Sequence, residues 1–135
     1  MKKRIFLGLL LSVILTVISS CTDKAKEVEK QAVEFLDAYF KVEYARAAEY
    51  CTDELKADII KTMESIESLE PGIKEMIIQN TSQSKAEITS VDTQSKKDTA
   101  IVAYKVILPN FPNGIENRLT LVKRDKSWKI CDLGQ

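Results

Sequence analysis

The hydrophobic pattern of this chain changes from a period of about 3.6 residues to a period of two near residue 84, and that change constrains the fold most strongly. Before it, apolar residues recur at steps of three and four, as on one face of a helix. After it, apolar and polar residues alternate, as along a strand. Because helices come first and an antiparallel meander follows, the sequence predicts an α+β domain, with helices packed on one face of a sheet of about four strands.

The helical half carries two apolar stripes. The first comprises Val28, Ala32, Phe35, Leu36, Tyr39 and Phe40, with a bend expected at 41–43 and a continuation through Tyr44 to Cys51. The second comprises Leu55, Ile59, Ile60, Met63, Ile66 and Leu69, and its helix is predicted to start at Thr52 or Asp53 as N-cap. Pro71 and Gly72 interrupt this stripe, and "IKEMIIQN" predicts a further short helix.

The second half predicts four strands in "KAEITSVDT", "TAIVAYKVILP", "IENRLTLVKR" and "WKICDL". In the first strand Val91 falls out of phase with Ala86 and Ile88, which indicates a β-bulge nearby. We expect "NFPNG" to be a connecting loop with its turn at Asn113-Gly114, and "DKS" to be a tight turn.

The N-terminus has the three parts of a secretory signal. "MKKR" is a positive region, and Ile5–Ile18 is an apolar run that falls short of the roughly 20 residues of a spanning helix. "ISSC" then resembles the bacterial lipobox, which implies cleavage before Cys21 and a lipid anchor on its sulfur. The alternative is an ordinary signal peptide that contains a cysteine. The predicted organisation is a signal peptide at 1–20, a lipidated tether at 21–26 and one domain at 27–135.

The lipoprotein interpretation places the protein in the cell envelope, anchored to the membrane through Cys21. Thr22 stands where some bacteria use Asp for retention at the inner membrane, so the outer membrane is favoured. The chain has 20 basic and 20 acidic residues, but Lys2, Lys3 and Arg4 precede the apolar run, which leaves 17 basic against 20 acidic from Cys21 onward. We therefore expect no nucleic-acid partner. The chain has no histidine, and we expect no metal and no cofactor.

Two segments, "AVEFLDAYFKVEYARAAEYCTDEL" and "LTLVKRDKSWKICDL", resemble the nuclear transport factor 2-like superfamily, in particular its small bacterial lipoproteins. The resemblance runs from about Val28 to Leu133. Tyr44, Ala47 and Ala48 match the hinge and the alanine-rich segment, whereas Val42-Glu43 stands where Gly-Asp is common. The resemblance implies a curved antiparallel sheet wrapped around helices, which forms a cone with a hollow interior. Members use that interior for isomerase or dehydratase chemistry or for small ligands, and some dimerise through the sheet.

Cys51 and Cys131 leave two alternatives open. Behind a secretion signal they form a candidate disulfide, whose long loop would contribute about 4–5 kcal/mol on the chain-entropy model. Against this, Cys131 follows Ile130 and alternation puts it on the face opposite that residue, which favours two separate thiols. A thiol nucleophile is not expected, because no histidine is present to activate one.

Three aromatic residues are candidates for the pocket lining: Tyr39, Tyr104 and Trp128. An isomerase would need a carboxylate base beside such phenols, and the strands offer only Glu116 and Asp132, neither flanked by pocket-like residues. Core packing is the simpler role for all three aromatics. Phe111, between Pro109 and Pro112, is either a contact site for a protein or a hydrophobic plug.

The sequence thus predicts a membrane-anchored lipoprotein with a non-catalytic binding or interaction domain. A protein partner or self-association through the sheet is favoured, because Ile101, Ala103 and Ile107 lie on its outward face. Binding of a small ligand in the cone is the alternative, and an isomerase-like enzyme is a more distant one.

Overall fold

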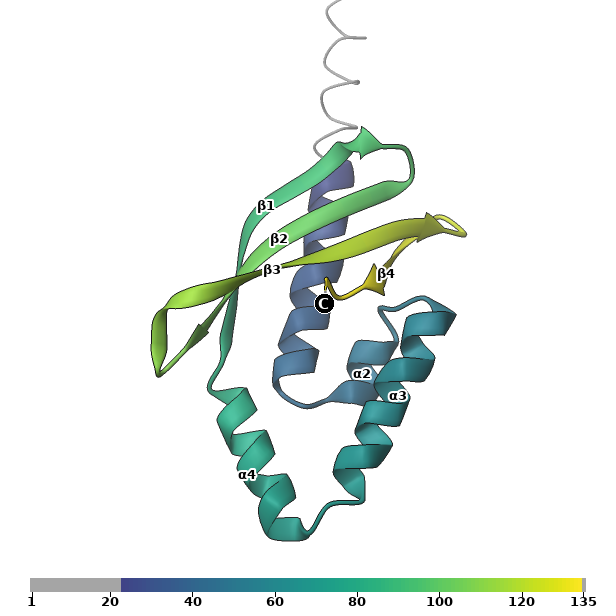
Figure 1. Ribbon diagram of the computed structural model, residues 1–135. Helices are drawn as coiled ribbons and strands as arrows, with labels where there is room; N and C mark the ends of the chain where they lie inside the picture. The colour runs from purple at the N-terminus through teal and green to yellow at the C-terminus, as the bar shows by residue number, and fades with distance from the viewer. Residues whose placement is uncertain (1–22, 135) are drawn as a thin grey trace, which may run out of the picture.

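The α+β prediction is confirmed. The structure, a computed structural model, describes residues 23–134, in which a helical half precedes a four-stranded antiparallel sheet (Figure 1). The helical elements are a first helix at 23–40, α2 (Tyr44–Ala48), α3 (Asp53–Glu67) and α4 (Pro71–Ser82). The strands are β1 (Lys85–Lys96), β2 (Thr99–Leu108), β3 (Phe111–Arg124) and β4 (Ser127–Asp132), in the spatial order β1-β2-β3-β4.

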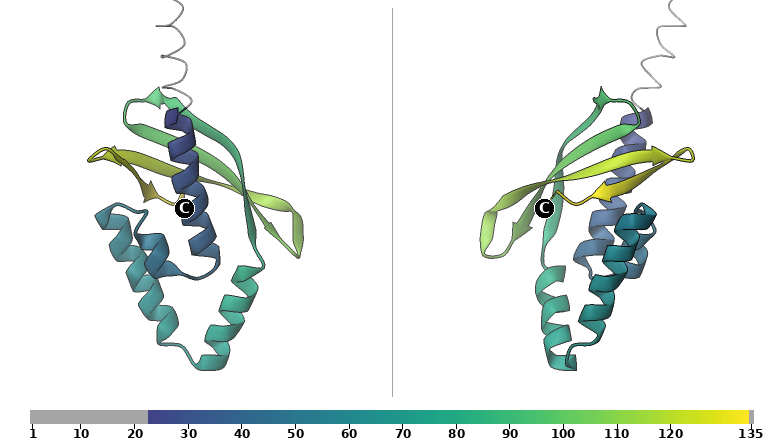
Figure 2. Two further views of the ribbon diagram at one scale, coloured as in Figure 1. Left: turned by 180° about the vertical axis from the view of Figure 1, so that it is seen from behind. Right: turned by 45° about the vertical axis from the view of Figure 1, so that its right-hand side comes forward.

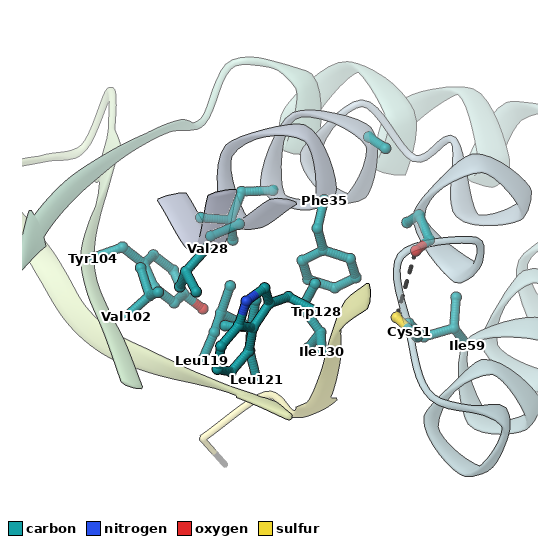
Figure 3. Close-up of a cluster of buried hydrophobic side chains, with 14 of the residues drawn as sticks. Val28, Phe35, Cys51, Ile59, Val102, Tyr104, Leu119, Leu121, Trp128 and Ile130 are labelled. Carbon is teal, nitrogen blue, oxygen red and sulfur yellow. Dashed lines mark hydrogen bonds between the residues drawn. The ribbon is translucent and has the colours of Figure 1, made fainter. Parts of the chain in front are cut away.

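The first helix lies across one face of the curved sheet, and α2 and α3 follow at its far end (Figures 1 and 2). The predicted stripe of this helix faces the sheet: Val28, Ala32, Phe35 and Leu36 are buried. They meet the inner faces of β2, β3 and β4. The buried strand residues of this core are Ala100, Val102, Tyr104, Leu119, Leu121, Trp128 and Ile130 (Figure 3).

The bend after the first helix forms where the sequence predicts it. Lys41 and Val42 make a turn, and the Glu43 N–H donates to the Ala38 carbonyl at 2.9 Å. Val42 has φ 62°, a left-handed conformation that is unusual for a β-branched residue. A valine therefore occupies a left-handed position, a conformation that glycine adopts more readily.

The helices α3 and α4 differ in how many of their residues are buried. Thr52 caps α3, as predicted, and its hydroxyl accepts from the Leu55 N–H at 3.5 Å. Ile59 is the buried residue of α3, and the predicted stripe reaches the surface at Leu69. Pro71 is the first residue of α4, a helix whose residues are all exposed or half-buried. α3 and α4 form a V whose point, the connection between them, lies away from the sheet (Figure 1).

The strand register confirms the predicted alternation. Val102 pairs with Val91 on one side and Leu119 on the other, so inner-face residues meet inner-face residues. The register shifts between Ile88 and Ser90, which is the predicted bulge. The tight turn of the "DKS" segment also forms, with positive φ at Asp125 and Lys126.

The predicted turn at Asn113-Gly114 is wrong. β2 and β3 connect through Pro109 and Asn110, and Asn113 and Gly114 lie inside β3. Gly114 has φ 76°, and the β2–β3 register shifts beside it, between Val106 and Leu108. Gly114 thus supports an irregularity in the β2–β3 ladder. Pro109, a residue type that favours the second position of a turn, starts the chain reversal five residues earlier.

Candidate functional site

A cavity of about 240 Å³ lies between the first helix and the inner face of the sheet. Its lining combines aromatic and aliphatic side chains with one amide: Phe35, Leu36, Tyr39, Phe40, Tyr104, Val106, Ile115, Asn117 and Leu133. The helix residues come from the C-terminal half of the first helix, and the strand residues come from the ends of β2 and β3 nearest their hairpin.

The cavity lies where the sheet loses a strand. β4 pairs with β3 only from Thr120 to Arg124, so the segment of β3 around Asn117 has no β4 residue beside it. The C-terminal tail crosses there instead. Gly134 lies against β3 so closely that a Cβ added to it would press against the Arg118 carbonyl and lie 2.8 Å from the Asn117 Oδ1 atom. Leu133 therefore contributes to the lining from outside the sheet.

Tyr39 and Tyr104, both candidates from the sequence, line this same cavity. Tyr39 stacks on Phe35 with ring centroids 5.5 Å apart and meets Tyr44 edge-on at 5.3 Å. Burial raises the pKa of Tyr39, and burial together with the nearby Tyr39 raises the pKa of Tyr104. Both hydroxyls therefore stay protonated near neutral pH and can donate hydrogen bonds.

Trp128, the third candidate, does not line the cavity. Its ring is buried among the strands and the first helix (Figure 3), and its Nε1–H is buried without a hydrogen-bond partner among the described residues. The Lys24 and Lys123 ammonium groups lie 5.5 and 6.0 Å from its ring centroid. These contacts give Trp128 the geometry of a packing residue.

The cavity lining contains no aspartate or glutamate. Asp58 and Asp132 line a neighbouring groove of about 350 Å³, which shares Tyr39 and Leu133 with the cavity, and both carboxylates are exposed. Asp132 accepts a hydrogen bond from the Gly134 N–H at 2.6 Å. Glu116 is also exposed and opposes Lys105 across the ladder. The phenols that an isomerase would use are present, but no buried carboxylate accompanies them among the described residues.

The two cysteines are free thiols in the structure. Cys51 is buried, and its Sγ–H donates to the Ala47 carbonyl at 3.4 Å, as Figure 3 shows. Cys131 is half-buried, and its Sγ–H donates to the Thr120 carbonyl at 3.4 Å. The backbone of Cys51 forms an isolated parallel β-bridge with that of Ile130, the residue before Cys131. The two backbones therefore lie side by side, while each thiol donates its hydrogen bond to a different carbonyl.

Phe111 and Ile115 are exposed on the β2–β3 hairpin, with 58% and 52% of their surface accessible. Ile115 also lines the cavity, so the hairpin forms one side of its mouth. Phe111 pairs with Leu108 at the turn, and its exposure makes it available to a partner. The sequence pattern did not mark Ile115, Asn117 and Leu133 as lining residues. For Asn117 a signal existed, because it is a polar residue in an otherwise apolar alternation.

The outward face of the sheet mixes apolar and charged residues. Ile101, Ala103 and Ile107 are half-buried there, and Ala103 opposes Arg118 while Lys105 opposes Glu87 and Glu116. The large exposed hydrophobic side chains lie elsewhere, on the helices, at Leu69 between α3 and α4, and on the β2–β3 hairpin. Self-association through this face stays a prediction.

Within residues 23–134 no group of three or more cysteine and acidic side chains is placed to hold a metal ion. Across the same residues, no helix combines the length and the apolar character that a membrane span requires. Cys21, the predicted lipidation site, lies outside the described residues. Residues 23–26, assigned to the tether from the sequence, are helical.

Comparison with known proteins gives little beyond the architecture. No family model matches the chain, and no curated protein matches it. Among solved structures, a Campylobacter jejuni protein described as a candidate NTF2-like transpeptidase is similar in fold, with a TM-score of 0.49 and 15% sequence identity over 77% of this chain and 96% of that one. The class of the protein is defined by its own architecture, a helix-covered, unclosed antiparallel sheet, which agrees with the cone that the sequence resemblance implies.

Proposed function

We propose that this chain is a lipid-anchored protein of the bacterial cell envelope whose domain binds a small, mostly apolar ligand without catalysing a reaction. The observation that carries the proposal is the cavity beneath the sheet. Its lining is aromatic and aliphatic except for the Tyr39 and Tyr104 hydroxyls and the Asn117 amide. Such a lining, apolar with a few converging polar groups, is typical of small-molecule sites.

The cavity volume limits the ligand. At about 240 Å³ it is smaller than the roughly 300–1,000 Å³ of typical ligand pockets, so it suits a single ring or a short branched chain with one hydroxyl or carbonyl. A ligand of about eight non-hydrogen atoms would gain about 4–5.5 kcal/mol, which corresponds to a Kd of about 0.1–1 mM.

The absence of a carboxylate from the lining supports a binding role over an isomerase role. Proton abstraction needs a base within hydrogen-bond reach of the substrate. Asp58 and Asp132 are exposed in the adjacent groove and do not belong to the lining of the cavity.

Chemical-shift titration of the ¹⁵N-labelled domain with p-cresol tests the proposal, with toluene as the analogue that lacks the hydroxyl. We expect saturable shifts for residues around Tyr39 and Tyr104, with weaker binding of toluene. Ile115→Asp places a charge at the cavity mouth without touching the core and should weaken p-cresol binding at least tenfold. Ile73→Asp, on an isoleucine of α4 that is also exposed, is the matched control and should bind p-cresol as the wild type does.

Two results would contradict this function. One is the absence of saturable shifts at millimolar p-cresol. The other is an equal loss of binding in the Ile115→Asp and Ile73→Asp variants, which would show that the cavity mouth has no special role.

Anchoring at Cys21 is the second part of the proposal, and the lipobox-like "ISSC" supports it. The first helix is already formed at residue 23, so only a short link separates the anchor from the fold. At about 1.5 Å per residue, the cavity residues at 35–40 lie about 18–26 Å along the helix from residue 23, where the described helix begins. Palmitate labelling in a bacterial host tests the anchor: Cys21→Ser should abolish incorporation, and equal labelling of the two proteins would contradict it.

A further inference from the structure

A second groove lies on the other side of the first helix, and we propose that it binds a short extended peptide, which adds to β1 as a fifth strand of the sheet. The proposal goes beyond the cavity ligand. It rests on an open sheet edge, a partly apolar groove beside that edge, and a pattern of charges that specifies the peptide.

β1 is an edge strand, since β2 is its neighbour on one side and no strand of the described chain is its neighbour on the other. Outside the ladder with β2, residues 85–92 make no backbone hydrogen bond to any described residue. An edge of this kind presents alternate N–H and C=O groups to any extended chain that approaches.

The groove runs between this edge and the first helix, with a volume of about 440 Å³. Its apolar lining comes from both walls: Val33, Leu36 and Phe40 on the helix, Ala86 and Ile88 on β1. Val33 exposes 46% of its surface, although it belongs to an otherwise well-packed helix. A groove between a strand edge and a helix is the arrangement in which strand addition gives affinity through the main chain and specificity through alternate side chains.

The usable edge is short. α4 ends at Ser82, just before β1, and the bulge between Ile88 and Ser90 breaks the regular register. Four residues, Lys85–Ile88, therefore remain for regular pairing. A stable dimer buries about 1,200–2,000 Å², which two four-residue strands do not approach, so the edge suits a peptide better than a second copy of this chain.

The side chains of Lys85–Ile88 determine which residue types the bound peptide needs at each position. Ala86 and Ile88 oppose Val106 and Tyr104, which line the inner face, so they point toward the groove. Lys85 and Glu87 point to the outer face, and neither has an ion-pair partner within 4.0 Å among the described residues. An antiparallel peptide would meet Ile88, Glu87, Ala86 and Lys85 in that order, which calls for the sequence apolar–basic–apolar–acidic.

Fluorescence anisotropy with a capped, fluorescein-labelled peptide Thr-Val-Lys-Leu-Glu-Thr tests the proposal. We expect saturable binding in the range of tens to hundreds of micromolar. Val33→Glu introduces a carboxylate into the groove and should weaken binding at least tenfold. Met76→Glu, on an exposed methionine of α4, is the matched control and should leave binding unchanged.

Two further comparisons separate strand addition from simple hydrophobic capture. Peptides N-methylated either at Val and Leu or at Lys and Glu should differ, because only one set of N–H groups faces β1; one peptide should lose binding and the other keep it. The charge-reversed peptide Thr-Val-Glu-Leu-Lys-Thr should bind about three- to tenfold more weakly to the wild type and regain affinity for the Lys85→Glu/Glu87→Lys double variant.

The proposal would be overturned if the wild type bound both N-methylated peptides equally well. It would also be overturned if the Val33→Glu and Met76→Glu variants bound the labelled peptide equally well. A dimer of the unliganded protein that Val33→Glu dissociates would also overturn it, since a second copy would then occupy the edge. These outcomes are independent of the cavity, because p-cresol binding depends on Ile115 and peptide binding on Val33.

Discussion

The two thiols of the folded domain should differ sharply in their reactivity toward an alkylating agent. Burial raises the pKa of Cys51 from 9.0 to about 12. The pKa of the half-buried Cys131 is also raised, first by burial and then by the neighbouring Asp132 carboxylate. Since the thiolate is the reactive form, the structure predicts that Cys131 reacts first and that Cys51 is protected.

The protection of Cys51 can be estimated. At pH 8, raising the pKa from 9.0 to about 12 lowers the thiolate fraction by about a thousandfold. A more basic thiolate is a better nucleophile, and a Brønsted coefficient of about 0.45 returns a factor of about 20–25. The net effect is an alkylation rate about 40-fold lower than that of the same cysteine in the unfolded chain, before any steric exclusion by the surrounding core.

The assay uses two variants that each keep one of these thiols. Cys21→Ser/Cys131→Ser retains Cys51, and Cys21→Ser/Cys51→Ser retains Cys131. Each is treated with iodoacetamide at pH 8, with and without 6 M urea, and the adduct is followed by mass spectrometry. We expect urea to accelerate alkylation of Cys51 at least 40-fold and alkylation of Cys131 by much less.

Equal alkylation rates for Cys51 in buffer and in urea would refute the reasoning. A peptide map of the oxidised Cys21→Ser protein that links Cys51 to Cys131 would refute it in a different way, by establishing the disulfide alternative. The raised pKa has a further consequence with a fixed sign. The unfolding free energy should fall as the pH rises from about 9 toward 12, by at most about 1.4 kcal/mol per pH unit, and Cys51→Ser should remove that part of the slope.

Four other predictions concern the fold. Leu119→Ala, in a fully buried position, should cost about 2–5 kcal/mol of unfolding free energy in urea titrations, whereas Ile101→Ala on the outer face should cost under about 1 kcal/mol; similar costs would place the core elsewhere. Gly114→Ala should cost about 1–2 kcal/mol by the same assay because Gly114 has φ 76° and a Cβ there would press on the Lys105 side chain; an unchanged midpoint would rule out the strained geometry. The Arg46 guanidinium, 2.9 Å from Asp37, and then Lys41 lower the pKa of that carboxyl, so stability should fall as the pH drops below about 4, and Asp37→Asn should remove this component of acid denaturation. If the sheet mediates self-association, sedimentation at micromolar concentration should show a dimer that Ile101→Glu dissociates; a monomer in the wild type would reject that prediction.

Periodicity predicted most of the fold because each stripe has a single surface to cover. The first helix buries Val28, Ala32 and Phe35 as its pattern requires, since the inner face of the sheet supplies buried apolar residues for it to pack on. β2 behaves in the same way, with Val102 and Tyr104 turned inward between two neighbouring strands. In these elements the face that the hydrophobic pattern marks as apolar is the face that the tertiary structure buries. They could therefore be predicted from the sequence alone.

The position of the β2–β3 turn and the exposure of α4 escaped prediction, because local and tertiary preferences differ there. Asn-Gly is the strongest short hairpin signal, yet Pro109 begins the reversal earlier and Gly114 serves the ladder irregularity instead. α4 carries Ile73 and Met76 at helical spacing, as a buried helix would, but no partner covers it within the described chain. A hydrophobic period therefore predicts the helix without predicting what it packs against.

The cavity and the groove depend on quantities that no periodicity contains. The cavity exists because β4 stops pairing at Thr120 and leaves Leu133, rather than another strand, to close the space beneath Asn117. The groove exists because the first helix lies close enough to β1 to form a wall but leaves Val33 partly uncovered. Leu36 and Phe40 line both spaces, so a substitution at either residue would alter the two sites together. Ile115 and Val33 each line one site alone, and they are therefore the positions at which the two proposed activities can be separated.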